Sequence, residues 1–151
     1  MPDFRRRKNR WDGFDYSADG DYFVTICTAQ RSCILGKILP GTSSVRLSEY
    51  EQAVLIAIER LQTVFPHVRI PIYVIMPNHV HMVLSLTESE HPLSSIINYF
   101  KGTVTKTTKG GIWQKSFYDH VIRDENDYNR ICDYIENNPA AWSSDDYYAP
   151  E

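Results

Sequence analysis

The sequence of residues 70–86 is IPIYVIMPNHVHMVLSL, and this stretch determines the fold that we predict. Two runs rich in β-branched and apolar residues, 70–76 and 79–86, flank the dipeptide Pro77–Asn78. Such runs are typical of strands, and a Pro-Asn pair between them is typical of a tight turn. Pro71 lies near the start of the first run, where a strand tolerates proline. The pattern therefore predicts an antiparallel hairpin.

Two amphipathic helices are predicted on either side of this hairpin. Upstream, Ser48 is a suitable N-cap, with Glu51 three residues later, and apolar residues then recur at helical spacing until Pro66. Downstream, apolar residues at helical spacing mark a second helix from Leu93, which we expect to end before the glycines at 110 and 111. The first helix therefore leads into the hairpin, and the second helix follows it.

The remaining elements complete an α+β order. Residues 22–28, YFVTICT, have the composition of a central strand, and residues 116–122 are expected to form the last strand. Residues 34–39 and 45–47 are expected to pair around a turn at 40–44. The resulting β-α-β-β-α-β order predicts a ferredoxin-like antiparallel sheet with helices on one face. Asp124 is the predicted N-cap of an additional C-terminal helix that ends before Pro139.

Composition restricts the class of protein. The chain has 151 residues, of which 42% are hydrophobic, and this size suits one domain spanning residues 1–151. No apolar run approaches the ~20 residues that a membrane span needs, and no apolar signal core follows the basic start. We therefore expect a cytoplasmic protein without a membrane partner. The three cysteines lack CxxC spacing, so neither a disulfide framework nor a cysteine zinc site is predicted.

Charge is distributed unevenly along the chain. The net charge is −3, yet residues 119–151 hold nine carboxylates against only Arg123 and Arg130. Two basic clusters lie elsewhere, one in the N-terminal arm (residues 1–20) and one that runs from the second helix toward the last strand with no acid in between. Their members are Arg5, Arg6, Arg7, Lys8 and Arg10, and Lys101, Lys106, Lys109 and Lys115. These clusters suit contacts with a phosphate backbone, or else they are a solubilising tail and a solvated face.

The predicted second strand of the hairpin begins with two histidines. His79 and His81 are separated by one apolar residue, so both imidazoles leave the same face of the sheet with Cα atoms roughly 7 Å apart. Two such rings can bind one metal ion. Strand histidines are also found simply hydrogen-bonded, so a metal site needs further ligands.

The C-terminal helix offers candidates for these further groups. Tyr134 and Asn138 are four residues apart and share one helix face, at the margin of the apolar stripe and in line with Asp127. They are a candidate nucleophile and a candidate ligand, or else a tyrosine at the edge of the core and an asparagine that caps the helix. His120, in the last strand, is a core histidine, a DNA contact or an acid-base group.

Five blocks of sequence resemble the REP-associated tyrosine transposases, a branch of the HUH single-strand endonucleases. The blocks are FDYSADGDYFVTICT (14–28), VIMPNHVHMVL (74–84), FKGTVTK (100–106), IWQKSFYDHVIRD (112–124) and ICDYIENNPAAW (131–142). They occur in the order of that family.

The resemblance implies a function. His79 and His81 would bind Mg²⁺ or Mn²⁺, Asn138 would be a further ligand, and Tyr134, on a catalytic helix at 124–138, would be the nucleophile. The substrate would be single-stranded or hairpin DNA of palindromic repeats, joined to the enzyme as a 5′-phosphotyrosine. Expected DNA contacts are Arg5, Arg6, Arg7, Lys8, Arg10, Lys101, Lys106 and Lys115, with His120 and Asp127 as accessory groups.

Other functions remain compatible with these residues. One is a hairpin-binding protein that has lost turnover, and another is an unrelated small metalloenzyme. The active species would be a monomer or a homodimer.

Overall fold

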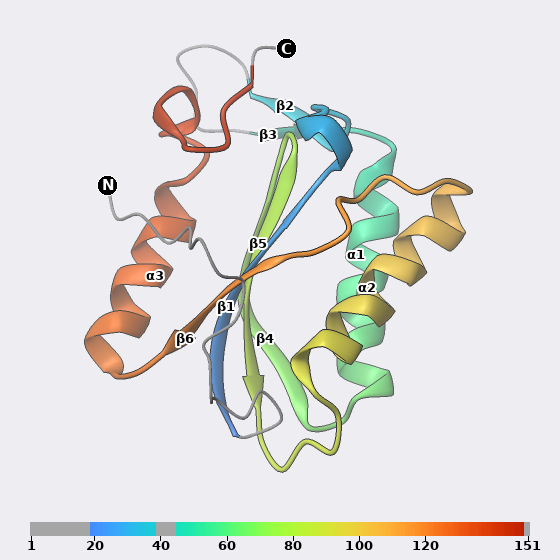
Figure 1. The fold of residues 1–151 in the computed structure, drawn as a ribbon. Helices are drawn as coiled ribbons and strands as arrows, with labels where there is room; N and C mark the ends of the chain where they lie inside the picture. Colours follow the sequence, from blue (N-terminus) through green and yellow to red (C-terminus); the bar gives the residue numbers. More distant parts are fainter. Residues whose placement is uncertain (1–18, 39–44, 150–151) are drawn as a thin grey trace.

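The computed structural model describes residues 19–38 and 45–149 (Figure 1). The predicted DNA contacts in the N-terminal arm, Arg5 to Arg10, and the predicted turn at 40–44 lie outside these ranges. Strands are β1 (Gly20–Cys27), β2 (Gly36–Ile38), β3 (Val45–Leu47), β4 (Val68–Met76), β5 (His79–Leu86) and β6 (Tyr118–Ile122). Helices are α1 (Tyr50–Val64), α2 (Leu93–Thr108) and α3 (Glu125–Asn137). Within the described ranges, no helix has the length and apolar character to cross a membrane.

The main sheet has four strands in the order β4-β5-β1-β6, and all its pairs are antiparallel. β2 and β3 form a separate two-stranded sheet. This arrangement confirms the predicted α+β fold, including the hairpin on either side of Pro77 and Asn78. In the register of β1 and β5, Cys27 pairs with His79 and Thr25 pairs with His81.

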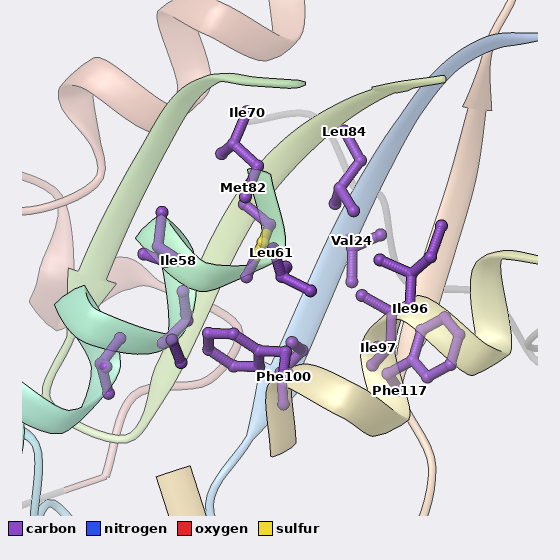
Figure 2. Close-up of a cluster of buried hydrophobic side chains, with 14 of the residues drawn as sticks. Val24, Ile58, Leu61, Ile70, Met82, Leu84, Ile96, Ile97, Phe100 and Phe117 are labelled. Carbon is purple, nitrogen blue, oxygen red and sulfur yellow. The ribbon is translucent and has the colours of Figure 1, made fainter. Parts of the chain in front are cut away.

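Helices α1 and α2 cover one face of this sheet (Figure 1). Alternate residues of β1 and β5 point toward them, because successive side chains of a strand leave opposite faces. The resulting core is shown in Figure 2, where Val24, Met82 and Leu84 of the sheet meet Leu61 of α1 and Phe100 of α2. This face is closed by apolar packing and carries none of the predicted catalytic groups.

Helix α3 packs against the opposite face of the sheet (Figure 1). Phe23 and Val83, which point away from the main core, pack against Ile131, Tyr134 and Ile135 of α3. Asp124 is the N-cap, as predicted, and its side chain accepts a hydrogen bond from the backbone N–H of Asp127. The predicted C-terminal helix is therefore confirmed, and it lies over the face from which odd-numbered residues of β5 project.

Three details differ from the sequence-based expectations. The N-cap of α1 is Glu49, so the prediction of Ser48 was wrong; the Ser48 hydroxyl instead donates to the carbonyl of Ile34 and accepts from the N–H of Tyr50. The left-handed residue that ends α2 is Lys109, with φ 59°, rather than a glycine. Strand β4 starts earlier than predicted, and its register shifts between Arg69 and Ile72, where Pro71 has no N–H to donate.

Candidate active site

The two histidines of β5 lie side by side on the face that α3 covers. Their ring centroids are 4.5 Å apart, and the exposed fractions of His79 and His81 are 0% and 1%. Strand alternation accounts for this, since Val80 between them points into the core beneath α1 and α2. The predicted imidazole pair therefore exists as a buried pair.

Each imidazole is oriented by a hydrogen bond at its Nδ1 atom. His79 Nδ1 lies 2.8 Å from Asn78 Oδ1, and His81 Nδ1 lies 2.8 Å from Thr25 Oγ1. The Asn78 amide is itself held, because its Nδ2 donates to the backbone carbonyl of Tyr147 at 2.8 Å. A carbonyl acceptor at Nδ1 places the proton of His79 there and leaves the Nε2 lone pair available.

The Nε2 atoms of both histidines are buried and make no hydrogen bond within the described residues. Buried polar atoms are nearly always paired, because an unpaired one costs free energy. Two adjacent imidazole Nε2 atoms without such a partner are an arrangement that suits a metal ion.

A carboxylate completes the group. One ligand atom each from His79, His81 and Asp145 lies within 4.8 Å of the other two. The Asn138 amide donates to the Asp145 carboxylate, while Asn138 Oδ1 is buried and has no hydrogen-bond partner within the described chain. Asn138 was proposed from sequence as a ligand, and it does reach this group. Asp145 was missed.

Tyr134 meets the histidine pair from α3. Its ring centroid lies 5.4 Å from that of His81 and 6.1 Å from that of Phe23, which it contacts edge-on. Only 8% of Tyr134 is exposed, so it is more buried than the marginal position predicted from the helical wheel. Tyr134 packs there with Phe23 and Val83 of the sheet.

A segment that follows α3, residues 142–149, also packs against the histidine pair. Within it, the Tyr147 ring centroid lies 4.8 Å from that of His79 and 5.9 Å from that of His81, and Trp142 packs at 6.2 Å from His79. The sequence analysis gave these residues no role. The sequence separation between His79 and these aromatic residues does not indicate a contact, because the path of the chain after α3 depends on its turns.

Burial also sets the protonation state of the pair. Removal from water lowers the pKa of His79 from 6.5 to about 3, with the Asn138 side chain opposing this effect. The same removal, followed by repulsion from His79, lowers the pKa of His81 well below 6.5. Both rings are therefore neutral at physiological pH, which is the form that binds metal ions.

The lowered pKa values make the metal-free fold sensitive to acid. We expect stability to be greatest above pH 6.5 and to fall as the pH drops toward 3, because only the unfolded imidazoles take up protons in that range. For His79 alone the loss at pH 5 is about 2 kcal/mol. Thermal melts with chelator at pH 7.5 and pH 5 should show this fall in Tm. His79→Gln should reduce it, whereas His67→Gln, at an exposed position, should not; a Tm that does not change with pH would refute the explanation.

The lysines predicted to contact DNA lie around α2. Lys101 Nζ donates to the carbonyls of Lys115 and Ser116 at 3.0 and 3.3 Å, and burial lowers the pKa of Lys101. Lys106 and Lys115 are exposed. Lys101 therefore ties α2 to the segment before β6, while the DNA contacts of all three remain predictions.

His120 and Asp127 form a separate cluster near the beginning of α3. His120 Nε2 lies 2.8 Å from Asp127 Oδ2, and Arg130 donates to Asp127 Oδ1 at 2.6 Å. Asp127 is seven residues before Tyr134, about 10 Å along the helix axis. The structure therefore does not bring these two accessory candidates to the histidine pair.

Comparison with known sequences places this site in context. No protein-family model matches the chain. A Haemophilus influenzae protein described only as uncharacterised is 31% identical over 169 residues, covering 95% of this chain and 93% of that protein. A putative REP-associated tyrosine transposase of the same organism is 27% identical over 83% of this chain and 73% of its own length. The REP-associated tyrosine transposase of Escherichia coli K12 is 35% identical over 44% of this chain and 41% of its own length.

Two solved structures share the fold. A REP-associated tyrosine transposase bound to a REP hairpin superposes with a TM-score of 0.68 and 27% identity, covering 93% of this chain and 73% of that one. A putative transposase from Deinococcus radiodurans has a TM-score of 0.53 and 19% identity, covering 85% of this chain and 97% of that one, and shows the fold alone.

Over most of its length the chain is therefore related to REP-associated tyrosine transposases, in sequence and in fold.

Proposed function

We propose that this protein is a metal-dependent single-strand DNA endonuclease and strand transferase that acts at hairpins of palindromic repeats. The observation that supports it most is the contact of Tyr134 with His81, beside two buried Nε2 atoms that have no partner among the described residues. The hairpin substrate is inferred from the relative whose structure contains a REP hairpin. We expect the protein to act in the cytoplasm, as a monomer or a homodimer.

The donor atoms fit a divalent metal ion. His79 Nε2, His81 Nε2 and a carboxylate oxygen of Asp145 would hold it, with Asn138 Oδ1 as a further oxygen donor. A mixed set of nitrogen and oxygen donors suits Mn²⁺ and allows Mg²⁺. When bound, the ion would neutralise charge on the scissile phosphate and polarise it for attack.

Tyr134 would supply the nucleophile. Its phenolic oxygen forms a bond to phosphorus, the bond to the 3′ oxygen breaks, and the phenolic proton is finally carried by the released 3′-hydroxyl. The product is a 5′-phosphotyrosine that retains the energy of the phosphodiester, so a second 3′-hydroxyl can reverse the reaction and join two strands. An ordinary tyrosine has a pKa near 10, so deprotonation must accompany attack.

The direct test is the formation of a covalent adduct. Labelled DNA hairpins with single-stranded flanks, incubated with the protein and Mn²⁺, should give a protein-DNA band on a denaturing gel, and chelator should abolish it. Hairpin binding without an adduct in any divalent metal would instead favour a binding protein that has lost turnover.

Asp145 is expected to be a metal ligand. Asp145→Asn should weaken Mn²⁺ binding about 10–100-fold, because a neutral amide replaces the only carboxylate among the four donors named above. Binding can be followed by the paramagnetic resonance signal of free Mn²⁺. The neighbouring Asp146→Asn is the matched control. Equal affinities of the two variants would show that Asp145 is not a ligand.

A further inference from the structure

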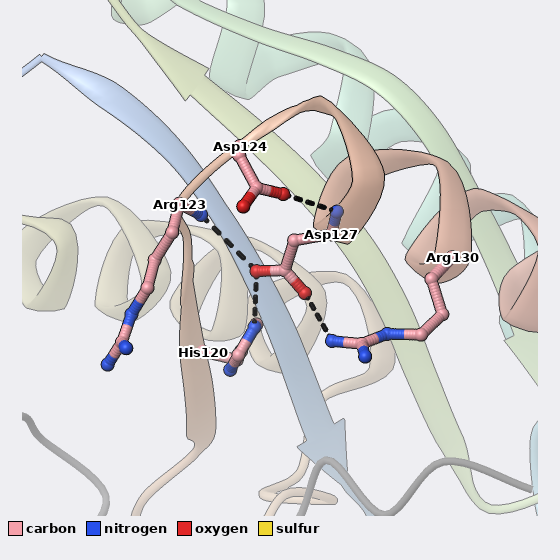
Figure 3. Close-up of polar contacts among 5 residues, drawn as sticks. All are labelled: His120, Arg123, Asp124, Asp127 and Arg130. Carbon is pink, nitrogen blue, oxygen red and sulfur yellow. Dashed lines mark hydrogen bonds and ion pairs between the residues drawn. The ribbon is translucent and has the colours of Figure 1, made fainter.

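A cleft lies at the beginning of α3, apart from the buried histidine pair, and Figure 3 shows five of the residues around it. Its volume is about 640 Å³, and it lies between the edge strand β6 and the first turns of α3. The residues that line it are His120, Arg123, Asp124, Asn126, Asp127 and Arg130.

Asp127 binds three of the groups that line this cleft. Its carboxylate accepts hydrogen bonds from His120, from the backbone N–H of Arg123 at 3.2 Å, and from the Arg130 guanidinium (Figure 3). Burial alone would raise the pKa of this carboxyl, but the three donors hold it below its usual range. Asp127 is only 8% exposed, so it is an ionised group beneath the surface of the cleft.

The arginines form the accessible part of the cleft. The Arg130 side chain is 56% exposed, and Arg123 is also exposed. Figure 3 shows their guanidinium groups and the His120 ring on the same side of Asp127. The Asp124 carboxylate, in turn, accepts the hydrogen bond that caps α3. Both arginines and Asp124 are therefore exposed, whereas the Asp127 carboxylate lies beneath them.

The position of the cleft relates it to Tyr134. Arg130 precedes Tyr134 by four residues, roughly one turn or 6 Å along α3. On β6, His120 shares a face with Tyr118, whose ring centroid lies 6.4 Å from that of Tyr147 beside the histidines. Nucleotides rise 3.4 Å each along a duplex strand and more when the strand is extended. Along the helix axis, Arg130 is thus about one or two nucleotides from the nucleophile and the deeper part of the cleft about three.

We propose that this cleft is a second DNA-backbone site, in which Arg123 and Arg130 hold phosphates of the single-stranded flank within about three nucleotides of the scissile phosphate. Planar guanidinium groups suit phosphate oxygens, and such contacts fix position without reading sequence. Neither arginine is among the DNA contacts predicted from sequence. The inference rests on the proposed function for the identity of the ligand.

The test uses a probe that needs no sequence recognition. Binding of fluorescent (dT)₂₀ to the Tyr134→Phe protein is measured by anisotropy between 50 and 300 mM salt. For two lost single-strand contacts, the double variant Arg123→Ala/Arg130→Ala should lower the salt slope by about 1.4 and weaken binding roughly twentyfold at 0.1 M salt.

Arg46→Ala/Arg60→Ala is the control, since it removes two exposed arginines on β3 and α1. Equal losses in both double variants would overturn the proposal. So would a Tyr134→Phe protein with all its arginines intact that does not bind (dT)₂₀ at 50 mM salt.

A second arm locates the contact. On an oligonucleotide that the wild-type protein cleaves, single methylphosphonates replace each of the three phosphates on either side of the scissile one. At one position, the neutral methylphosphonate should slow cleavage by the wild-type protein but should not slow cleavage by the double variant any further. If the losses in cleavage rate from the methylphosphonate and from the double variant add up at every position, the site is refuted. If no substrate forms an adduct, the proposed function fails, while the (dT)₂₀ result still decides whether the cleft binds DNA.

Discussion

Tyr134→Phe is expected to abolish the covalent protein-DNA adduct, with a loss of at least about a thousandfold. The change removes one oxygen atom, the nucleophile in the proposed reaction, and no neighbouring group replaces it. The ring and its edge-on contact with Phe23 are retained, so the fold should persist. A denaturing gel measures the adduct, and anisotropy checks that DNA binding is unchanged within a few fold.

The matched control is Tyr147→Phe. Tyr147 lies nearly as close to His81 as Tyr134 does, at 5.9 against 5.4 Å between ring centroids, so proximity alone does not decide between them. Burial raises the pKa of Tyr147 far above its usual value, so the Tyr147 hydroxyl is hard to deprotonate and is a poor nucleophile. Tyr134, in contrast, lies on α3, the helix that the proposed reaction uses. Tyr147→Phe should still form the adduct. Mass spectrometry that finds the DNA on Tyr147 would reverse the assignment.

His81→Ala is expected to reduce metal-dependent cleavage by at least about a hundredfold. One of the two proposed nitrogen ligands is lost, and with it the ring that lies against Tyr134. The same variant should lose the rise in Tm that Mn²⁺ gives the wild-type protein, because a ligand that binds only the folded state stabilises it.

An exposed histidine provides the comparison for this variant. His67→Ala removes an exposed imidazole outside the pair, so this variant should keep both cleavage and the rise in Tm with Mn²⁺. Circular dichroism confirms that each variant is folded. If His81→Ala cleaves equally well with Mn²⁺ and in chelator, the metal has no role at this pair.

The local elements were predictable because their signals lie in adjacent residues. The hairpin around Pro77 and Asn78, and the Asp124 cap of α3, each depend on a few neighbouring positions. The imidazole pair followed from strand alternation alone. Its meeting with Tyr134 was supplied by the family resemblance rather than by any spacing rule, since helix packing across a sheet depends on the whole fold.

The missing parts of the site depend on tertiary structure. Asp145 and Tyr147 follow a helix end and two turns, and their contacts arise where that segment folds back over β5. Lys101 has a structural contact that its sequence context did not indicate. Its charge and its basic neighbours suggest a phosphate contact, yet its ammonium group donates to two carbonyls of its own chain.

The buried atoms His79 Nε2, His81 Nε2 and Asn138 Oδ1 have a consequence for evolution. Apolar side chains in place of an imidazole and of its hydrogen-bond partner together would remove these desolvated polar atoms from the interior, and the apo protein would keep or gain thermal resistance. Screening for heat tolerance alone, in a library that varies each histidine together with Asn78 or Thr25, should therefore select apolar pairs. Retention of histidine at both would have to be enforced by another requirement, and DNA transfer is the one proposed for them.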